Sequence, residues 1–172
     1  TRDLVLRFNA RFGEEFPLPE PIIPERGARV MSLQDATAKM SKSDPDESSR
    51  ILVLDPPDTI RAKVKRAVTD SGSEVRYDWE EKPGISNLLE MMSLFSGTPI
   101  PAIEAEFASG GYGKFKEAVA EAVIAGLAPI RANHQALDDA DVDRLMQRGA
   151  LDARTKAEGY QPRVRKRVGL AG

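Results

Sequence analysis

PGISNLLEMMSLFSG, residues 83–97, has the features of a complete helix. It opens with Pro83, which suits the first turn of a helix, and closes with Gly97, which suits the residue that follows one. We therefore predict an amphipathic helix here, and we assign its two methionines to a core rather than to a cofactor site. Its apolar side chains recur at helical spacing: Leu88, Leu89, Met92 and Phe95.

Helical patterns extend on both sides of this stretch and dominate the second half of the chain. Asp58 is placed to begin a helix that precedes residues 83–97. Pro129 predicts a kink or a restart near Leu127, and Gly159 and Pro162 predict that the last helix is open or bent in its middle. The helices expected downstream span residues 100–108, 113–137, 138–148 and 150–168.

The first part of the chain has a different pattern. Residues 2–13 predict one helix, and residues 16–27 contain four prolines and predict an extended connector. The short apolar runs 29–33 and 51–54 are compatible with strands. Two such strands cannot form a stable sheet alone, so we expect a partner segment outside this sequence.

The predicted fold class is therefore mainly α. We divide the chain into a short α/β part, residues 1–57, and a helical bundle-like domain, residues 58–172. The sequence begins without methionine and almost without a helix cap, which suggests that it is part of a longer chain.

Composition excludes several kinds of chemistry. Among 172 residues there are 25 Lys and Arg against 27 Asp and Glu, for a formal net charge of −2. The absence of cysteine removes disulfides, thiolate metal sites and cysteine nucleophiles, and a single histidine, His134, makes a His-rich zinc site untenable. No apolar run is long enough to cross a bilayer and no signal-peptide pattern is present, so we expect a cytoplasmic protein without membrane partners.

The polar stretch Lys39-Met40-Ser41-Lys42-Ser43 is the strongest candidate for chemistry. Two lysines on a loop can bring movable positive charge to a polyphosphate, and the serine hydroxyls can donate hydrogen bonds. Such donors lower a reaction barrier if negative charge grows on a leaving pyrophosphate. On composition alone, however, a Lys/Ser loop beside acidic residues is more often solvated surface.

The same five residues match the second signature of class I aminoacyl-tRNA synthetases. Their surroundings, residues 27–33, 66–71 and 84–89 with Tyr112-Gly113 and the closing 168–170, resemble bacterial tryptophanyl-tRNA synthetases in the same order. The resemblance covers nearly the whole chain. It implies that residues 1–57 are the end of a Rossmann-type nucleotide-binding domain and that residues 58–172 are the tRNA (anticodon)-binding domain.

What the resemblance implies is a tryptophan–tRNA ligase. ATP and L-tryptophan would give tryptophanyl-adenylate and pyrophosphate, and the tryptophanyl group would pass to tRNA(Trp). Lys39 and Lys42 would stabilise the departing pyrophosphate, and Val30 would contact the adenine side of ATP through its backbone. Met40 would pack beneath the loop or near the adenine, while Ser41 and Ser43 would hold phosphate or loop geometry. The family also implies Mg²⁺ with ATP, no protein-held metal, and a homodimer when full length.

Two departures from the family limit these expectations. The family's first signature contains a histidine near its N-terminus, whereas His134 lies in the helical half, and the residues that select tryptophan belong to the same earlier region. We therefore expect a C-terminal half that cannot form the adenylate alone. The alternative is a non-catalytic helical RNA-binding or adaptor module that keeps the signature as a relic.

Two basic stretches, residues 61–66 and 163–167, are plausible contacts for tRNA phosphates. Helix stabilisation and solvation explain such charge equally well. Three aromatic residues are candidates for stacking on bases by type alone, but side chains of this kind are more often partly buried. They are Tyr77, Trp79 and Tyr112.

Overall fold

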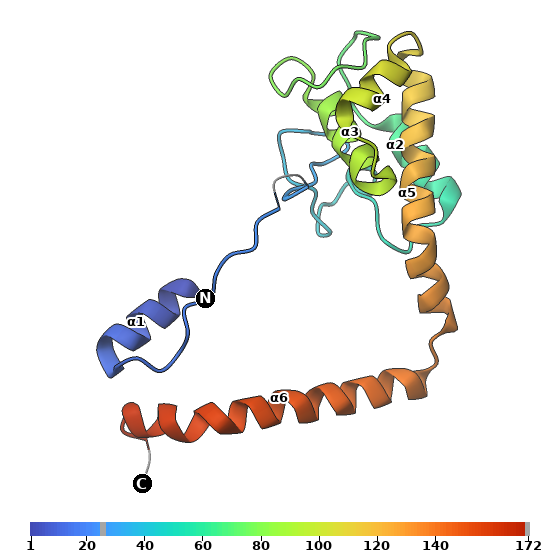
Figure 1. Ribbon diagram of the computed structural model, residues 1–172. Coiled ribbons are helices and arrows are strands. Elements are labelled where there is room, and N and C mark those ends of the chain that lie inside the picture. Colours follow the sequence, from blue (N-terminus) through green and yellow to red (C-terminus); the bar gives the residue numbers. More distant parts are fainter. Residues whose placement is uncertain (25–26, 171–172) are drawn as a thin grey trace. The chain divides into compact units, whose positions relative to one another are not determined.

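The computed structural model of the chain describes residues 1–24 and 27–170, and helices dominate it (Figure 1). The predicted mainly α class is confirmed. The elements, in chain order, are α1 (Arg2–Phe12), the 3₁₀ turn η1 (Glu47–Ser49), α2 (Pro57–Arg66), α3 (Pro83–Ser96), α4 (Ile100–Phe107), α5 (Gly111–Ala136) and α6 (Asp139–Arg167).

The chain forms two compact units. The first combines residues 1–22 with residues 136–172, and the second comprises residues 23–135. The boundary after residue 57, which we drew from the change in sequence pattern, lies inside the second unit. The assignment of residues 1–57 and 58–172 to two functional domains stays a prediction.

The buried core lies in the second unit, and α3 supplies much of it. α3 begins at Pro83 and ends at Gly97, whose backbone is left-handed (φ 73°), as the sequence pattern predicts. Two adjacent leucines of α3, Leu88 and Leu89, are no more than 1% exposed. In Figure 1, α2, α3 and α4 lie alongside the first part of α5. The core side chains that these neighbours contribute include Ile60, Val64, Ile103, Phe115, Val119 and Val123.

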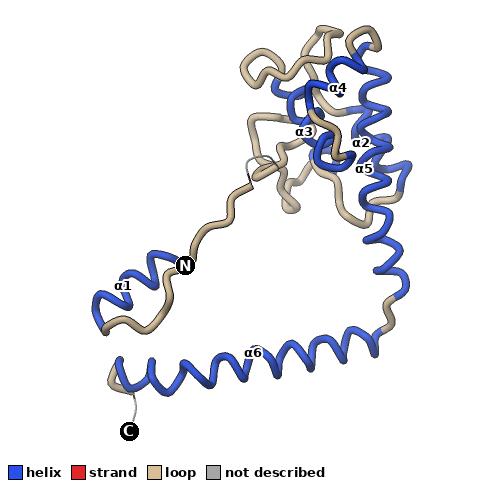
Figure 2. Tube along the Cα trace, in the orientation of Figure 1, coloured by secondary structure: helices blue, strands red, loops and turns tan. Residues whose placement is uncertain are grey.

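The two predicted strands do not form. Between Met31 and Lys39 there is one isolated antiparallel bridge, and residues 51–54 are turn and loop. Figure 2 accordingly shows loops and helices in the described residues and no strand. No strand among the described residues extends this bridge. The other backbone groups of residues 29–33 therefore form their hydrogen bonds with side chains and with loop residues.

The predicted restart of α5 near Leu127 and the predicted opening of α6 near Gly159 and Pro162 are wrong. α5 runs through Pro129 to Ala136 without restarting, and α6 runs through Gly159 and Pro162 as one helix of 29 residues. A proline in a helix leaves the carbonyl four residues earlier without its donor. At both prolines that residue is exposed, so water can satisfy the carbonyl and the helix persists.

The first unit consists of α1, the connector after it and α6, and neither helix has a buried residue. Residues 17–24 have no regular structure, as the four prolines predict, while residues 25–26 of the expected connector lie outside the described residues. The Glu15 carboxylate accepts hydrogen bonds from Arg163 (2.6 Å) and Arg167 (2.7 Å) of α6. Phe16 stacks on Tyr160, with ring centroids 5.8 Å apart.

Candidate functional site

The Lys39–Ser43 loop grows out of a short hairpin. The Ser32 amide donates to the Ala38 carbonyl (2.8 Å), and the Met40 amide donates to the Val30 carbonyl (3.0 Å). These two bonds flank the bridge between Met31 and Lys39. The backbone on both sides of Lys39 is therefore held, while the residues after Met40 turn away as a loop.

Val30, Lys39, Met40 and Lys42 line one hollow of about 380 Å³ in the surface of the second unit. Four of the six residues predicted to hold ATP are thus brought together. Val30 and Met40 are partly buried, whereas both lysines are exposed. The hollow therefore has an apolar side and a cationic side, which suits a nucleotide whose base is apolar on its faces and whose phosphates are anionic.

Ser41 and Ser43 act on the loop itself. Their hydroxyl oxygens lie 3.1 Å apart, and the Ser43 amide donates to the Ser41 hydroxyl (3.4 Å). The Asp44 amide donates to the Ser41 carbonyl (3.3 Å). Of the two roles expected for these serines, holding loop geometry is therefore the one for which the described contacts provide a basis.

Arg50 also lines the hollow, and the sequence patterns did not single it out. Its Nη1 donates to the carbonyls of Asp44 (2.6 Å) and Asp46 (3.2 Å), just beyond the lysine loop. Its Nε is buried with no protein partner in the described contacts. The run Ser48-Ser49-Arg50 contains no recognisable motif, so only the fold could place this further cation beside the two lysines.

A partly buried polar cluster ties the segment that follows α2 to α3 and α5. The Tyr112 hydroxyl donates to the Asp70 carboxylate (2.7 Å), and the Lys82 ammonium donates to both Tyr112 (2.9 Å) and Asp70 (3.2 Å). Burial alone would raise the pKa of Asp70, but hydrogen bonds from Tyr112, the Gly72 amide and Lys82 outweigh it and lower the pKa. This network fixes the 67–72 segment against α3 and α5.

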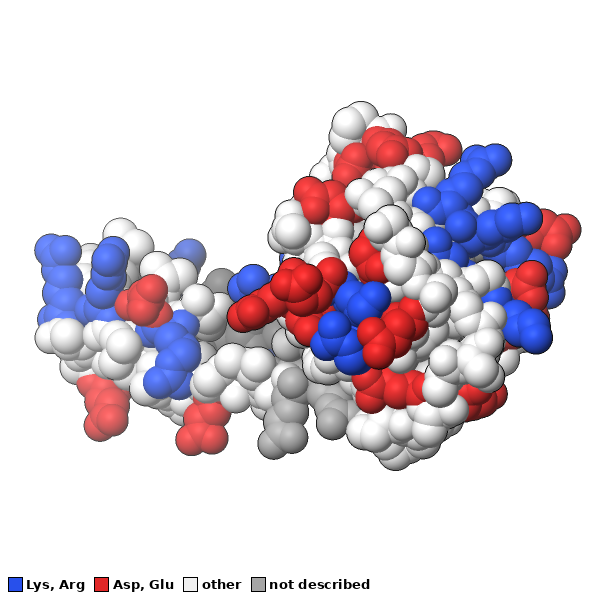
Figure 3. All heavy atoms as spheres, turned by 90° about the horizontal axis from the view of Figure 1, so that it is seen from above, with Lys and Arg blue, Asp and Glu red and all other residues white. Residues whose placement is uncertain are grey.

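The first basic stretch is only partly available to a partner. Arg61 pairs with Glu121 (2.6 Å) and Asp58 (2.8 Å), and Lys63 forms a largely buried ion pair with Asp55 (2.7 Å). Figure 3 shows Lys and Arg side chains gathered at one edge of this unit with acidic side chains beside them. The exposed cations of this stretch are Arg61, Lys65 and Arg66.

The second basic stretch, at the end of α6, divides in the same way. Arg163 and Arg167 bind Glu15, whereas Arg165 and Lys166 are exposed.

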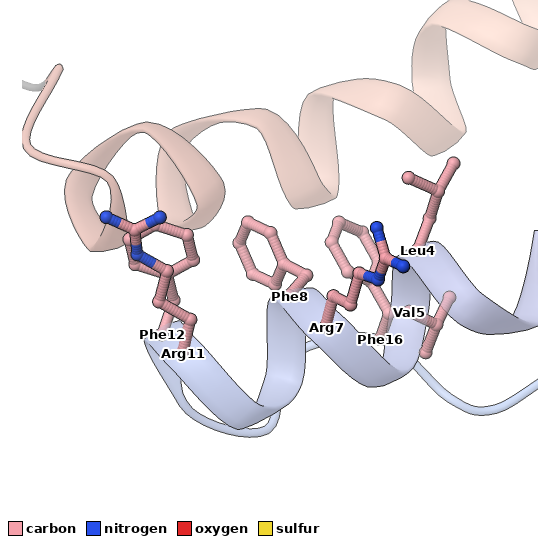
Figure 4. Close-up of a pocket in the computed structure, with 7 residues that line it drawn as sticks. All are labelled: Leu4, Val5, Arg7, Phe8, Arg11, Phe12 and Phe16. Carbon is pink, nitrogen blue, oxygen red and sulfur yellow. The ribbon is translucent and has the colours of Figure 1, made fainter.

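A hollow of about 440 Å³ lies on the same unit beside α1, and the Phe8 ring points from α1 toward α6 (Figure 4). Its lining is aromatic and basic: Leu4, Val5, Arg7, Phe8, Arg11, Phe12 and Phe16.

The aromatic candidates for base stacking are engaged within the protein. Trp79 donates its indole N–H to the Tyr77 hydroxyl (2.9 Å), which in turn donates to Glu90 (2.7 Å). Tyr77 and Trp79 are 38% and 37% exposed, and Tyr112 belongs to the partly buried polar cluster. His134 is exposed on α5.

Residues 1–24 and 27–170 offer neither a cluster of metal ligands nor a helix that could cross a membrane. Within these residues no three acidic, imidazole or thiol side chains gather as metal ligands. None of the helices described there combines the length and the apolar character that crossing a bilayer requires.

Two loop lysines beside an apolar wall, on a mainly helical scaffold, are features that a class of protein handling nucleotide phosphates would need. Comparison with known families identifies the class: the model for class I tRNA synthetases of the tryptophan and tyrosine type matches residues 1–128. The chain belongs to this family.

The relatives are more specific. A tryptophan–tRNA ligase from Caldanaerobacter subterraneus is 48% identical over 99% of this chain and 52% of its own length. One from Listeria monocytogenes is 47% identical with the same two coverages. The chain thus spans about half the length of these curated relatives and corresponds to their C-terminal half.

Solved structures of tryptophanyl-tRNA synthetases also match this chain over about half of their own length. Tryptophanyl-tRNA synthetase from Mycoplasma pneumoniae superposes with a TM-score of 0.90 at 27% identity, covering 99% of this chain and 52% of that one. The Campylobacter jejuni enzyme, solved with ADP and tryptophan, superposes with a TM-score of 0.64 at 29% identity, covering 98% of this chain and 52% of that one.

Proposed function

We propose that the chain is the ATP-phosphate-handling and tRNA-facing half of a tryptophan–tRNA ligase. The observation that carries the proposal is the shared hollow of Val30, Lys39, Met40 and Lys42. The names of the relatives support the amino acid, and the ADP and tryptophan bound by the Campylobacter enzyme support a nucleotide and tryptophan as ligands.

In the proposed reaction a tryptophan carboxylate oxygen attacks the α-phosphorus of ATP, and the bond to pyrophosphate breaks. Negative charge grows on the leaving pyrophosphate, so cations that meet it there stabilise the transition state more than the bound substrates. Lys39 and Lys42 supply that charge from the loop. Val30 and Met40 support the adenine side, and Ser41 and Ser43 keep the loop in shape.

Magnesium enters this scheme as the counterion of ATP. The described residues offer no cluster of metal ligands, so the phosphate oxygens and water would hold the ion. The chain's own contribution is the ammonium charge of the two loop lysines.

The further elements of the proposal concern partners and location. tRNA(Trp) would contact the helical part, residues 58–172, through cations that the fold leaves exposed, among them Lys65, Arg66, Arg165 and Lys166. Residues 1–57 would be the end of the nucleotide-binding domain. The tryptophan pocket would lie in the other half of the enzyme, which would be a cytoplasmic homodimer.

The test is tryptophan-dependent exchange of pyrophosphate into ATP. The chain alone should give no exchange, whereas a chimera that adds the unmatched half of the Caldanaerobacter relative should give it. In that chimera Lys42→Ala should lower the exchange rate by about a hundredfold or more while changing tryptophan affinity little.

The matched control is Lys156→Ala, which removes an exposed lysine of α6 and should leave exchange unchanged. Equal losses in rate and tryptophan affinity for Lys42→Ala would contradict the assigned role. A chimera that is folded and binds tRNA(Trp), but shows no exchange, would favour the non-catalytic RNA-binding alternative.

A further inference from the structure

The hairpin that carries the lysine loop is incomplete as a sheet. The bonds of Ser32 and Val30 to the 38–40 segment lie on either side of Met31. In an antiparallel pair, a residue between two such bonds directs its own N–H and C=O away from the partner strand. The backbone groups of Met31 therefore need partners on the opposite side, where the structure has no strand among the described residues.

Asn87 of α3 takes the place of that missing strand. The Met31 amide donates to Asn87 Oδ1 (3.0 Å), and Asn87 Nδ2 donates to the Met31 carbonyl (3.0 Å). A side-chain amide carries one acceptor and one donor group side by side, which matches the N–H and C=O of one residue. Asn87 is 3% exposed, so both bonds are protected from water.

The clamp sits on a rigid part of the molecule. Asn87 is flanked on α3 by Ser86 and Leu88, which are 0% and 1% exposed. Because α3 is packed into the core, its side chain can hold Met31 in one position. Met31 in turn lies beside Val30, which lines the hollow, and opposite Lys39, which lines it from the other side of the bridge.

We propose that Asn87 is a positioning residue for ATP: its amide clamp on Met31 fixes the hairpin that presents Val30 and Lys39 to the nucleotide. This inference rests on the proposed function for its ligand, but the clamp itself is a property of the fold. Asn87 lies away from the hollow and acts through Met31. Loss of the clamp should therefore loosen the hairpin first and weaken nucleotide handling as a consequence.

The matched control is the neighbouring residue. Ser86 is equally buried, and its hydroxyl accepts a hydrogen bond from the Asp78 amide (2.8 Å), so it also ties α3 to a loop. That loop does not belong to the lysine hairpin. Ser86→Ala thus reports the general cost of losing one buried bond from α3. Asn87→Ala removes both bonds of the clamp, while the isosteric Asn87→Asp replaces the donor to the Met31 carbonyl by an oxygen that repels it.

The first measurement is hydrogen exchange of the chain itself. In Asn87→Ala and Asn87→Asp the amides of Ser32 and Met40 should exchange at least tenfold faster, with Val119 and Val123 of α5 unchanged. In Ser86→Ala the two hairpin amides should keep their protection. If Asn87→Asp leaves the hairpin amides as protected as in Ser86→Ala, the clamp is refuted, whatever the function of the protein.

The second measurement uses the exchange-active chimera. Asn87→Asp should raise the KM for ATP about tenfold relative to Ser86→Ala and leave the KM for tryptophan unchanged. Faster hairpin exchange with an unaltered KM for ATP would refute positioning. If the unsubstituted chimera shows no exchange activity, the proposed function fails and with it the nucleotide role of Asn87, while hydrogen exchange still decides the clamp.

Discussion

The two units of the chain are stabilised in different ways. Residues 23–135 enclose a core in which Ile60, Ile85 and Phe115 are fully buried, whereas α1 and α6 of the first unit have no buried residue. The first unit depends on Glu15, which accepts from two arginines of α6, and on a stacked ring pair. Apolar burial is nondirectional and large, while ion pairs whose arginines stay in contact with water, as Arg163 and Arg167 do, contribute less. We therefore expect the two units to respond differently to the same perturbation.

The contrast is plain in α6, which is a long helix (Figure 1). Its Leu145 and Met146 are 71% and 67% exposed. Its helical form does not need a core. A capping box joins Asp138 and Asp141 at its start. Its last turn contains Arg165, Lys166 and Arg167, whose positive charges interact favourably with the negative end of the helix dipole. Local signals are thus enough to form this helix, although they do not by themselves provide a packed domain.

The largest expected loss of stability comes from adding a side chain at Gly84, where the second unit has no room for one. A Cβ there would lie 2.3 Å from the Val68 carbonyl oxygen, which is backbone and cannot turn aside. Gly84→Ala should lower the free energy of unfolding by about 3 kcal/mol. Chemical denaturation followed by circular dichroism measures this.

Gly113 is the matched control for that substitution, because an added Cβ there meets nothing within 4 Å. Gly113→Ala lies inside α5 and should leave stability unchanged or raise it by up to about 1 kcal/mol. Equal stability of the two variants would mean that the 67–70 segment does not pack against α3 as described.

Acid should loosen the first unit before the second. Hydrogen bonding from Arg163 lowers the pKa of Glu15 from its ordinary value of 4.5; burial opposes this, and Arg167 adds to it. Because the folded pKa is the lower one, the contact stabilises α1 fully above about pH 4.5 and is lost as the pH falls through the folded pKa. Amides of α1 should therefore lose protection at low pH while amides of α3 keep it.

Glu15→Gln provides the control, since glutamine keeps the shape without the titrating charge. Its α1 amides should be less protected than those of the parent at pH 7 and should show little further change on acidification. Should α1 and α3 of the parent lose protection at the same pH, the contrast between the two units would be wrong.

The smallest change in stability is expected from a substitution at Leu145. It is 71% exposed, so Leu145→Ala should change the free energy of unfolding of the chain by less than about 0.5 kcal/mol. Leu88→Ala, the same substitution at 1% exposure, should cost about 3 kcal/mol. Thermal and chemical unfolding of both variants tests this, and a comparable loss in each would show that α6 buries Leu145 against a partner in solution.

Much of the helical fold could be predicted from sequence because helices depend on local signals. Pro83 and Gly97 bound α3 as expected, and α1 ends one residue before Gly13. The predicted breaks at Pro129 and Pro162 were wrong because the sequence does not show that the carbonyls concerned face water. The predicted strands were wrong because strand pairing is nonlocal, and among the described residues these runs make only the one bridge between Met31 and Lys39.

The candidate site was predicted unevenly for the same reason. Lys39 and Lys42 form a contiguous motif and could be found by inspection. Arg50 and Asn87 could not be found in this way, because each acts on backbone groups that only the fold brings near. Arg50 donates to the carbonyls of Asp44 and Asp46. Asn87 bonds to both backbone polar groups of Met31.

The sequence by itself determined the helical class, the positions of the main helices and the lysine loop with its family, because spacing, caps and contiguous motifs are properties of neighbouring residues. Only the tertiary structure decided that Val30 and Lys42 line one hollow and that Asn87 anchors the hairpin beside it. It also decided which cations are paired internally, as Lys63 is by Asp55. These features depend on contacts between residues distant along the chain, and a local pattern carries no information about which distant groups will meet.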